Sequence, residues 1–480
     1  MTARGRARPT TSGSAGPRFG RLRTRIQVFT LWMGIALAVG AVPVRGDTRS
    51  PWTRHEPVPE PHHPEVTVSV DWLARRVDAR DVVVIDCRTS SAYGAGHIPG
   101  AISFPPASVT SISSFPDIQL LPEVFGNLGL SGRERLVCCG DVSSSESAAL
   151  VFWLLELSGA KGALLLDGGV TGWRASGREL STELTELPAV TWRPAPDPGL
   201  LATREYVRRS YGIAGVEIVD ARGDEAWRGP ILREDWGERL RVGHIPHSLP
   251  FDFTSFFVPD GTLRTPSETW SAFEKLGPRP SNPVYLLDEF VVYGWGRVGG
   301  AEARHQDTGE SATGDEEWGQ GPLAYVLLRR AGVERVRLYP GGWADWSGDP
   351  YLPVVRVIGA DELMERVRSS RRWLHTDAPP ADFAFFDVRH PADYRRGHIR
   401  GSVSLRSDYF ADSLDVRLER YWPDIDRARA PIVTYCYGDD CIRSRGTSTD
   451  AARSGFVYIE RFFGGLDEWR YAGGKLVGAE

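Results

Sequence analysis

Two cysteines near the end of the chain have the surroundings of reactive thiols. Cys436 directly follows the apolar run 431–435, which predicts a buried strand. Cys441 lies five residues further on in a polar loop. A helix is expected after the loop, although Gly446, Thr447, Ser448 and Thr449 are poor helix formers. Backbone N–H groups and the dipole at a helix N-terminus favour a thiolate in such a position. Cys436 is therefore the candidate nucleophile of the chain.

A phosphatase or arsenate-reductase site would use the same kind of thiol in a different pattern. Those sites need Cys-x5-Arg, so that a guanidinium can hold the oxyanion in the loop. The sixth residue after Cys436 is Ile442, and the pattern therefore fails.

The segment around Cys436 belongs to a pattern that occurs three times. Each copy has an apolar run ending in Asp-x-Arg, then Gly-His-Ile, then Gly-Gly-x-x-x-Trp. The Asp-x-Arg motifs begin at Asp86, Asp220 and Asp387; the histidines are His97, His244 and His398; the tryptophans are Trp173, Trp346 and Trp469. Such an order at domain-sized intervals indicates tandem copies of one fold. The length of 480 residues agrees with about three domains.

Each repeat alternates apolar strands with helices. In the first, strands are expected at 82–85, 135–138 and 163–166, with a helix at 148–157. Unbroken β-branched runs are typical of parallel strands covered on both faces. The pattern predicts an α/β protein with three tandem domains, each a small doubly wound parallel sheet flanked by helices.

These motifs resemble the rhodanese, or sulfurtransferase, family. The first copy carries the closest match, Tyr93-Gly94-Ala95-Gly96-His97-Ile98-Pro99-Gly100-Ala101, whereas the second departs at His247 and the third at Arg400. The resemblance implies a parallel five-stranded sheet and a catalytic cysteine that carries a persulfide. We interpret the Asp-x-Arg and Gly-His-Ile residues as structural.

In this resemblance Cys436 is the persulfide nucleophile. Its active-site loop comprises Tyr437, Gly438, Asp439, Asp440, Cys441, Ile442 and Arg443. Asp439 and Asp440 would repel thiosulfate, and Arg443 and Arg445 could offset them. Cys441 could resolve a persulfide, form a regulatory disulfide with Cys436, or line the loop.

The other two repeats differ at this position. Aligning strand ends places Cys139 at the nucleophile position of repeat one, as a second candidate nucleophile, with Cys138 and Cys87 as buried core residues. In repeat two the apolar run 284–287 is followed by Asp288, and a carboxylate cannot carry a persulfide. We interpret this copy as a degenerate site.

The expected domains follow from the repeats and the proline-rich linkers. They are 1–46, a signal peptide or anchor; 47–64, a Pro/His-rich linker; 65–185, rhodanese domain 1; 198–357, inactive domain 2 with an insertion at about 291–320; and 358–480, the catalytic domain 3.

The first 46 residues contain eight arginines and no acidic residue, and an apolar stretch runs from Val28 to Val44. This pattern predicts export, either with cleavage near Ala41 or Gly46 or with the segment kept as a membrane anchor. The net charge of −5 is therefore carried by a more acidic body, which gives no support to nucleic-acid binding.

The leading hypothesis is an exported, periplasmic sulfurtransferase that moves sulfane sulfur from thiosulfate or a related donor to a thiol or cyanide. No cofactor and no metal are expected, and a membrane is involved only through an uncleaved N-terminal segment. The alternatives are a non-catalytic scaffold of rhodanese modules and a thiol–disulfide redox protein using Cys436 and Cys441. The sequence names no protein partner.

Overall fold

The computed structural model describes residues 65–79, 81–108, 118–141, 145–229, 241–259, 261–275, 289–296, 320–369, 382–405, 410–438 and 442–478. The chain divides into two compact units, 1–58 and 59–480, and all described residues belong to the second. The predicted signal segment and linker lie outside the described residues. No helix within the described ranges is long and apolar enough to cross a membrane.

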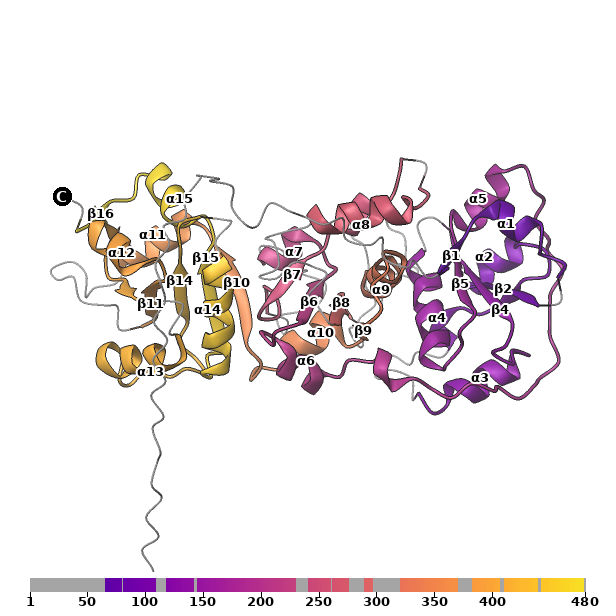
Figure 1. Ribbon diagram of the computed structural model, residues 1–480, viewed down its shortest axis with the longest axis horizontal. Coiled ribbons are helices and arrows are strands. Elements are labelled where there is room, and N and C mark those ends of the chain that lie inside the picture. Colours follow the sequence, from indigo (N-terminus) through magenta and orange to yellow (C-terminus); the bar gives the residue numbers. More distant parts are fainter. Residues whose placement is uncertain are drawn as a thin grey trace, which may run out of the picture. The chain divides into compact units, whose positions relative to one another are not determined.

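The first sheet has five parallel strands in the order β1-β5-β4-β2-β3 (Figure 1). The strands are β1 (Thr67–Val68), β2 (Val82–Asp86), β3 (Ile102–Ser103), β4 (Arg135–Cys139) and β5 (Ala163–Leu166). The helices are α1 (Val70–Ala74), α2 (Ser90–Ala95), η1 (Pro106–Ser108), α3 (Leu121–Asn127), α4 (Ser145–Leu157) and α5 (Gly169–Ala175). Apolar residues of α1 and α5 pack on one face of the sheet, and those of α3 and α4 on the other.

The last sheet repeats this topology in the order β10-β15-β14-β11-β13, again with parallel pairs. Its strands are β10 (Val354–Ile358), β11 (Ala384–Asp387), β13 (Val403–Ser404), β14 (Ile432–Tyr435) and β15 (Tyr458–Phe462). Its helices are α11 (Ala360–Ser369), α12 (Pro391–Arg396), α13 (Phe410–Tyr421), α14 (Ile442–Arg453) and α15 (Gly465–Tyr471). The short strands β12 (His398–Ile399) and β16 (Leu476–Val477) form an antiparallel pair. Figure 1 shows α14 beside β14 and β15, which it contacts.

The middle sheet has four parallel strands in the order β7-β6-β8-β9. They are β6 (Val216–Asp220), β7 (Ser248–Pro250), β8 (Glu289–Tyr293) and β9 (Val336–Tyr339). A parallel bridge between Leu201 and Leu338 takes the place of a fifth strand beside β9. The helices are η2 (Pro198–Leu200), α6 (Arg204–Ser210), α7 (Asp224–Arg228), η4 (Phe253–Phe256), α8 (Pro266–Lys275), α9 (Gly321–Arg330) and α10 (Gly342–Ser347).

The α/β class and the parallel strands are confirmed, but two predicted boundaries are wrong. Strand β10 pairs with β15, so the last domain begins by Val354 and not at 358. The insertion cannot begin at 291, because Val291 and Val292 are fully buried in β8. Most of the insertion, 297–319, lies outside the described residues. Both errors arise because short apolar strands do not reveal from sequence which sheet they join.

Candidate functional site

The Asp-x-Arg motif has the structural role expected for it. In each sheet the arginine donates hydrogen bonds to the aspartate carboxylate and to the carbonyl of the glycine of Gly-His-Ile. The partners are Arg88 with Asp86 and Gly96, Arg222 with Asp220 and Gly243, and Arg389 with Asp387 and Gly397. All six charged side chains are buried. The histidines His97 and His398 each stack on the tyrosine four residues earlier.

Strand register then defines which positions are equivalent in the three sheets. The aspartate of each motif lies opposite Cys139 in the first sheet, Tyr293 in the second and Tyr435 in the third. The residues that follow these are Gly140, Gly294 and Cys436. Each offers its carbonyl to the first turn of the Gly-Gly helix, accepting from Val170, Trp343 and Leu466, respectively. Of these three equivalent positions, only the third carries a thiol.

The alignment that placed Cys139 at the nucleophile position is therefore wrong by one residue. Strand β4 extends through Cys139, whose side chain packs on the face of α1 and α5, and the strand-end position belongs to Gly140. Cys139 occupies the position of Tyr293 and Tyr435, whose hydroxyls donate to the motif aspartates. Burial, and then the carboxylate of Asp86, raise the pKa of the Cys139 thiol well above its usual value. The sequence Cys138-Cys139-Gly140 does not show where the strand ends, so the alignment error of one residue could not be detected from the sequence.

The alignment of Asp288 is also wrong, for a related reason. Asp288 itself lies outside the described residues, but strand β8 starts at Glu289, after it. The strand predicted at 284–287 is therefore placed too early, and Gly294 takes the nucleophile position. The polar residue Glu289 at the start of β8, which binds Arg337, hid this strand in the sequence.

Gly140 also lies beside a small cavity of about 20 Å³. Phe257 and Leu263, from the segment before α8, contribute to its lining together with Gly140. A space of this size holds about one water molecule. The described residues beside Gly140 therefore leave only a small space.

Cys436 directly follows β14 and is buried. Its exposed fraction is 2%, and it takes part in a disulfide bond. Cys87, Cys138 and Cys139 are free and buried, as expected for core residues in the first two cases. The fifth cysteine of the chain, Cys441, lies outside the described residues, as do Asp439 and Asp440.

The described part of the loop is held on the side of α12. Tyr437 is 40% exposed, and its hydroxyl donates to Asp393 at 2.6 Å. The guanidinium of Arg389 lies 5.7 Å from the centre of the Tyr437 ring. The Asp393 carboxylate raises the pKa of Tyr437, after burial, and so keeps it protonated. Gly438 follows Tyr437, and at the far side of the loop Arg443 is exposed.

Helix α14 follows the loop, and its residues differ from those of its counterpart α4. The residues of α4 from Ala148 to Leu155 are buried and apolar. The buried residues among the first eight of α14 are instead polar: Ser444, Arg445, Thr447, Ser448 and Thr449. The hydroxyls of the last three donate to carbonyls four residues earlier, which satisfies them inside the helix. Despite its poor helix formers, this segment is helical.

Arg445 does not face the loop, contrary to the expectation that it offsets the loop aspartates. Its guanidinium binds the carboxylate of Glu217 in β6 and the carbonyl of His247. Both Arg445 and Glu217 are buried, so this pair joins α14 to the middle sheet. His247 also accepts or donates a bond at 3.0 Å with Thr449.

Sequence reasoning missed two buried polar residues on the face of the sheet that α14 covers. Arg461 in β15 pairs in register with Thr434 in β14, two residues before Cys436. The equivalents of Arg461 are Leu165 and Leu338, both in the apolar core. Comparing the three Gly-Gly motifs residue by residue would have revealed this exception, because Arg461 stands three residues before Gly464.

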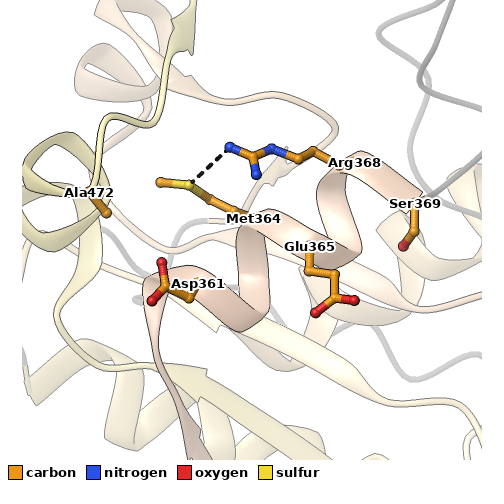
Figure 2. Close-up of a pocket in the computed structure, with 6 residues that line it drawn as sticks. All are labelled: Asp361, Met364, Glu365, Arg368, Ser369 and Ala472. Atoms are coloured by element: carbon orange, nitrogen blue, oxygen red, sulfur yellow. Dashed lines mark hydrogen bonds between the residues drawn. The ribbon is translucent and has the colours of Figure 1, made fainter.

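A larger open pocket of about 530 Å³ lies elsewhere on this sheet (Figure 2). It is lined by α11 residues, including Asp361 and Arg368, and by Ala472, and an N–H of Arg368 reaches the Met364 sulfur at 3.8 Å. Met364 belongs to the core between the sheet and α11, whereas Cys436 packs on the opposite face. The pocket is therefore separate from the thiol site.

Cys436 thus lies buried at the carboxyl end of a central parallel strand, and a loop and helix α14 follow it. The Rhodanese-like domain model matches residues 69–176 and 370–472. The thiosulfate sulfurtransferase of Azotobacter vinelandii is 28% identical over 298 residues, which are 59% of this chain and 94% of that protein. A probable 3-mercaptopyruvate sulfurtransferase of Pseudomonas aeruginosa is 30% identical over 300 residues, 59% of this chain and 95% of that protein.

Among solved structures, a 3-mercaptopyruvate sulfotransferase from Escherichia coli shares 24% identity, covers 58% of this chain and 98% of its own, and has a TM-score of 0.45. The chain belongs to the rhodanese-like sulfurtransferase family.

Proposed function

We propose that this chain is a sulfurtransferase whose working thiol is Cys436. The observation that carries the proposal is the strand register, which puts Cys436, Gly140 and Gly294 at equivalent positions. A glycine cannot carry sulfur, so the other two sheets lack the nucleophile at this position. The segment from Ile442 begins a helix of 12 residues, whose N-terminal dipole favours an anion at the loop.

The proposed reaction has two steps. The Cys436 thiolate attacks the outer sulfur of the donor, the S–S bond of the donor breaks, and its electron pair leaves with the departing group, sulfite in the case of thiosulfate. The resulting persulfide is then attacked at its terminal sulfur by a thiolate or cyanide. The Cys436–sulfur bond breaks, and the thiolate is regenerated without net oxidation of the protein.

The disulfide at Cys436 supports a second candidate function, thiol–disulfide exchange. Since the other three described cysteines are free, Cys441 is the proposed partner of Cys436. An oxidised Cys436 cannot accept sulfur, so two electrons from an external thiol must first reduce the bond. Activity that increases with dithiothreitol, and then stays constant, would indicate a regulatory disulfide rather than a redox function.

The decisive experiment measures thiocyanate formation from thiosulfate and cyanide by the reduced full chain. Cys436→Ser should lower turnover by at least a thousandfold, because a hydroxyl cannot accept sulfane sulfur. Cys138→Ser is the matched control and should keep most of the activity. Mass spectrometry should find about 32 Da added to the Cys436 peptide after exposure to the donor. Full activity of Cys436→Ser would overturn the assignment, and a persulfide without turnover would indicate a different acceptor.

Two further proposals concern the rest of the chain. The middle sheet is a rhodanese module without a thiol, supported by its strand order and by its Asp-x-Arg pair. Export is supported by the basic and apolar N-terminal segment. Cell fractionation tests export, and full-length protein confined to the cytoplasm would contradict it.

A further inference from the structure

The face of the last sheet that carries Cys436 contains a buried cation, Arg461, that has no carboxylate partner among the described residues and lies over the rings of Trp227 and Phe463. The exposed fraction of Arg461 is 2%, and its described hydrogen bond runs from Nη2 to the Ser444 hydroxyl at 2.9 Å. Its Nε has no hydrogen-bond partner. Among the described residues no carboxylate pairs with it, which is unusual because a buried charge is normally paired.

The surroundings of Arg461 add positive rather than negative charge. Burial, followed by the nearby charges of Arg445 and Arg228, lowers the pKa of Arg461 to about 9. Glu217, the buried carboxylate on this side, is already bound to Arg445. His244 and His247 also face this group, and burial lowers the pKa of both, so they are neutral at pH 7.

The position of Arg461 relates it to the thiol. Residues 432, 434 and 436 alternate onto one face of the sheet, and Arg461 lies beside Thr434 on the next strand. Ser444, which accepts from Arg461, is in the first turn of α14, directly after the Cys436 loop. The Oγ1 of Thr434 is also buried without a partner. Unsatisfied donors thus gather under the strand end that carries the cysteine.

At the equivalent positions of the other two sheets, all of which the structure describes, there is no such cluster. The equivalents of Arg461 are Leu165 and Leu338, and those of Thr434 are Cys138 and Val292. A buried, unpaired arginine destabilises a fold, and here it replaces a core leucine only where the thiol is present. The cost of burying Arg461 therefore calls for a favourable interaction that offsets it. Attraction between its guanidinium and an anionic Cys436 thiolate would be such an interaction.

We propose that Arg461 is a positioning residue for Cys436: its buried guanidinium is the counter-charge that favours the thiolate and the anionic persulfide. This inference rests on the proposed function, since it concerns the same thiol. The charge acts through the protein interior, where the effective dielectric constant of about 20 is lower than that of water and weakens the interaction less. The other charged groups beside the described loop residues are the buried Arg389, Asp393 and the exposed Arg443, and they remain in place in the test.

The test measures the thiol pKa of Cys436 in the full chain, in a Cys441→Ser background that prevents the proposed disulfide. The rate of alkylation of the Cys436 peptide by iodoacetamide is followed by mass spectrometry as a function of pH. Arg461→Leu should raise the pH of half-maximal rate by about one unit or more, which is about a tenfold slower reaction well below that pH. Arg453 lies at the far end of α14, about 16 Å along the helix from its first residue, Ile442. Arg453→Leu should therefore leave the pH of half-maximal alkylation nearly unchanged.

A stability measurement separates this role from a structural one. Arg461→Leu should keep or raise the melting temperature, because it removes an unpaired buried charge. An unchanged thiol pKa, or an equal shift in Arg453→Leu, would overturn the proposal. If Arg461→Leu does not fold, Arg461→Met, which keeps an unbranched side chain, is measured in the same way. A chain that never forms a persulfide would refute the proposed function and still show this difference in pKa.

Discussion

At the scale of single residues, Cys139 and Cys436 differ in their position relative to the strand end. Cys139 is the last residue of β4, whereas Cys436 is the first residue after β14. Burial and the Asp86 carboxylate raise the pKa of the Cys139 thiol, so this thiol stays protonated below that raised value. We expect iodoacetamide to leave Cys139 unmodified in the reduced native chain at pH 8, while Cys436 is modified. Peptide mass spectrometry distinguishes the two, with urea-unfolded protein as the control in which both react. Labelling of Cys139 at a rate similar to that of Cys436 would contradict the strand register.

The same register makes a gain-of-thiol prediction. Gly140→Cys should introduce a thiol at the position equivalent to Cys436, with its backbone carbonyl still bound to the Val170 N–H. Because Phe257 and Leu263 line the small cavity there, we expect this thiol to react slowly and to transfer no sulfur. Thiocyanate formation by Gly140→Cys in the Cys436→Ser chain is the measurement. Restored turnover would show that the first sheet retains an open site.

The sequence predicted Cys436 as the candidate nucleophile because a polar loop after a β-branched run is a local pattern. The sequence could not show that Cys139 and Asp288 are not equivalent to Cys436. Equivalent positions in the three sheets are identified by the pairing of neighbouring strands, which the sequence does not give. The role of Arg445 also depended on a contact, with Glu217, more than two hundred residues away in the chain. Strands β2, β5 and β11 were predictable from their apolar runs, whereas the partner of β10 was not.

At the scale of elements, the loop before β7 contacts α14 through a residue in a restricted conformation. His247 has φ 67°, and its equivalents are Gly100 at 76° and Gly401 at 82°. Only glycine adopts this region without strain, although Asn tolerates it better than most residues. Burial, followed by the charges of Arg445, Arg453 and Arg461, lowers the pKa of His247 to about 3.

This lowered pKa predicts a pH dependence of stability. Between about pH 6.5 and pH 3 the unfolded chain binds a proton at His247 that the folded chain does not, so stability falls as pH decreases. We expect this residue to reduce the free energy of unfolding by about 1–2 kcal/mol between pH 7 and pH 5. Urea unfolding of the chain and of His247→Asn at both pH values measures it, with His244 retained in both proteins. An identical loss in the two proteins would exclude His247 as a contributor.

At the scale of the whole molecule, the middle sheet and the sheet that carries Cys436 meet through a buried ion pair. The side chains of Arg445 and Glu217 have exposed fractions of 5% and 3%. At the corresponding position of α4, Ala149 packs in an apolar core with residues of α9. Both contacts combine apolar and polar groups, because α4 and α9 are also joined by the Arg329–Glu156 ion pair and the middle and last sheets share one apolar cluster. The Arg445–Glu217 pair differs in being almost fully buried.

The polar contact should be tested by a double-mutant cycle. Glu217→Ala leaves the Arg445 charge buried and unpaired, and we expect a loss of about 3–5 kcal/mol in the free energy of unfolding. Arg445→Ala combined with Glu217→Ala removes both charges and should recover part of that loss, since neither desolvated group then remains. The control is Asp224→Ala, which removes the partner of Arg228 from an exposed i,i+4 pair and should change stability by well under 1 kcal/mol. Urea unfolding of the four proteins of the cycle gives the coupling energy. A coupling near zero would mean that the two sheets are held together by their apolar contacts alone, and the polar residues of α14 would then serve the thiol site rather than the contact.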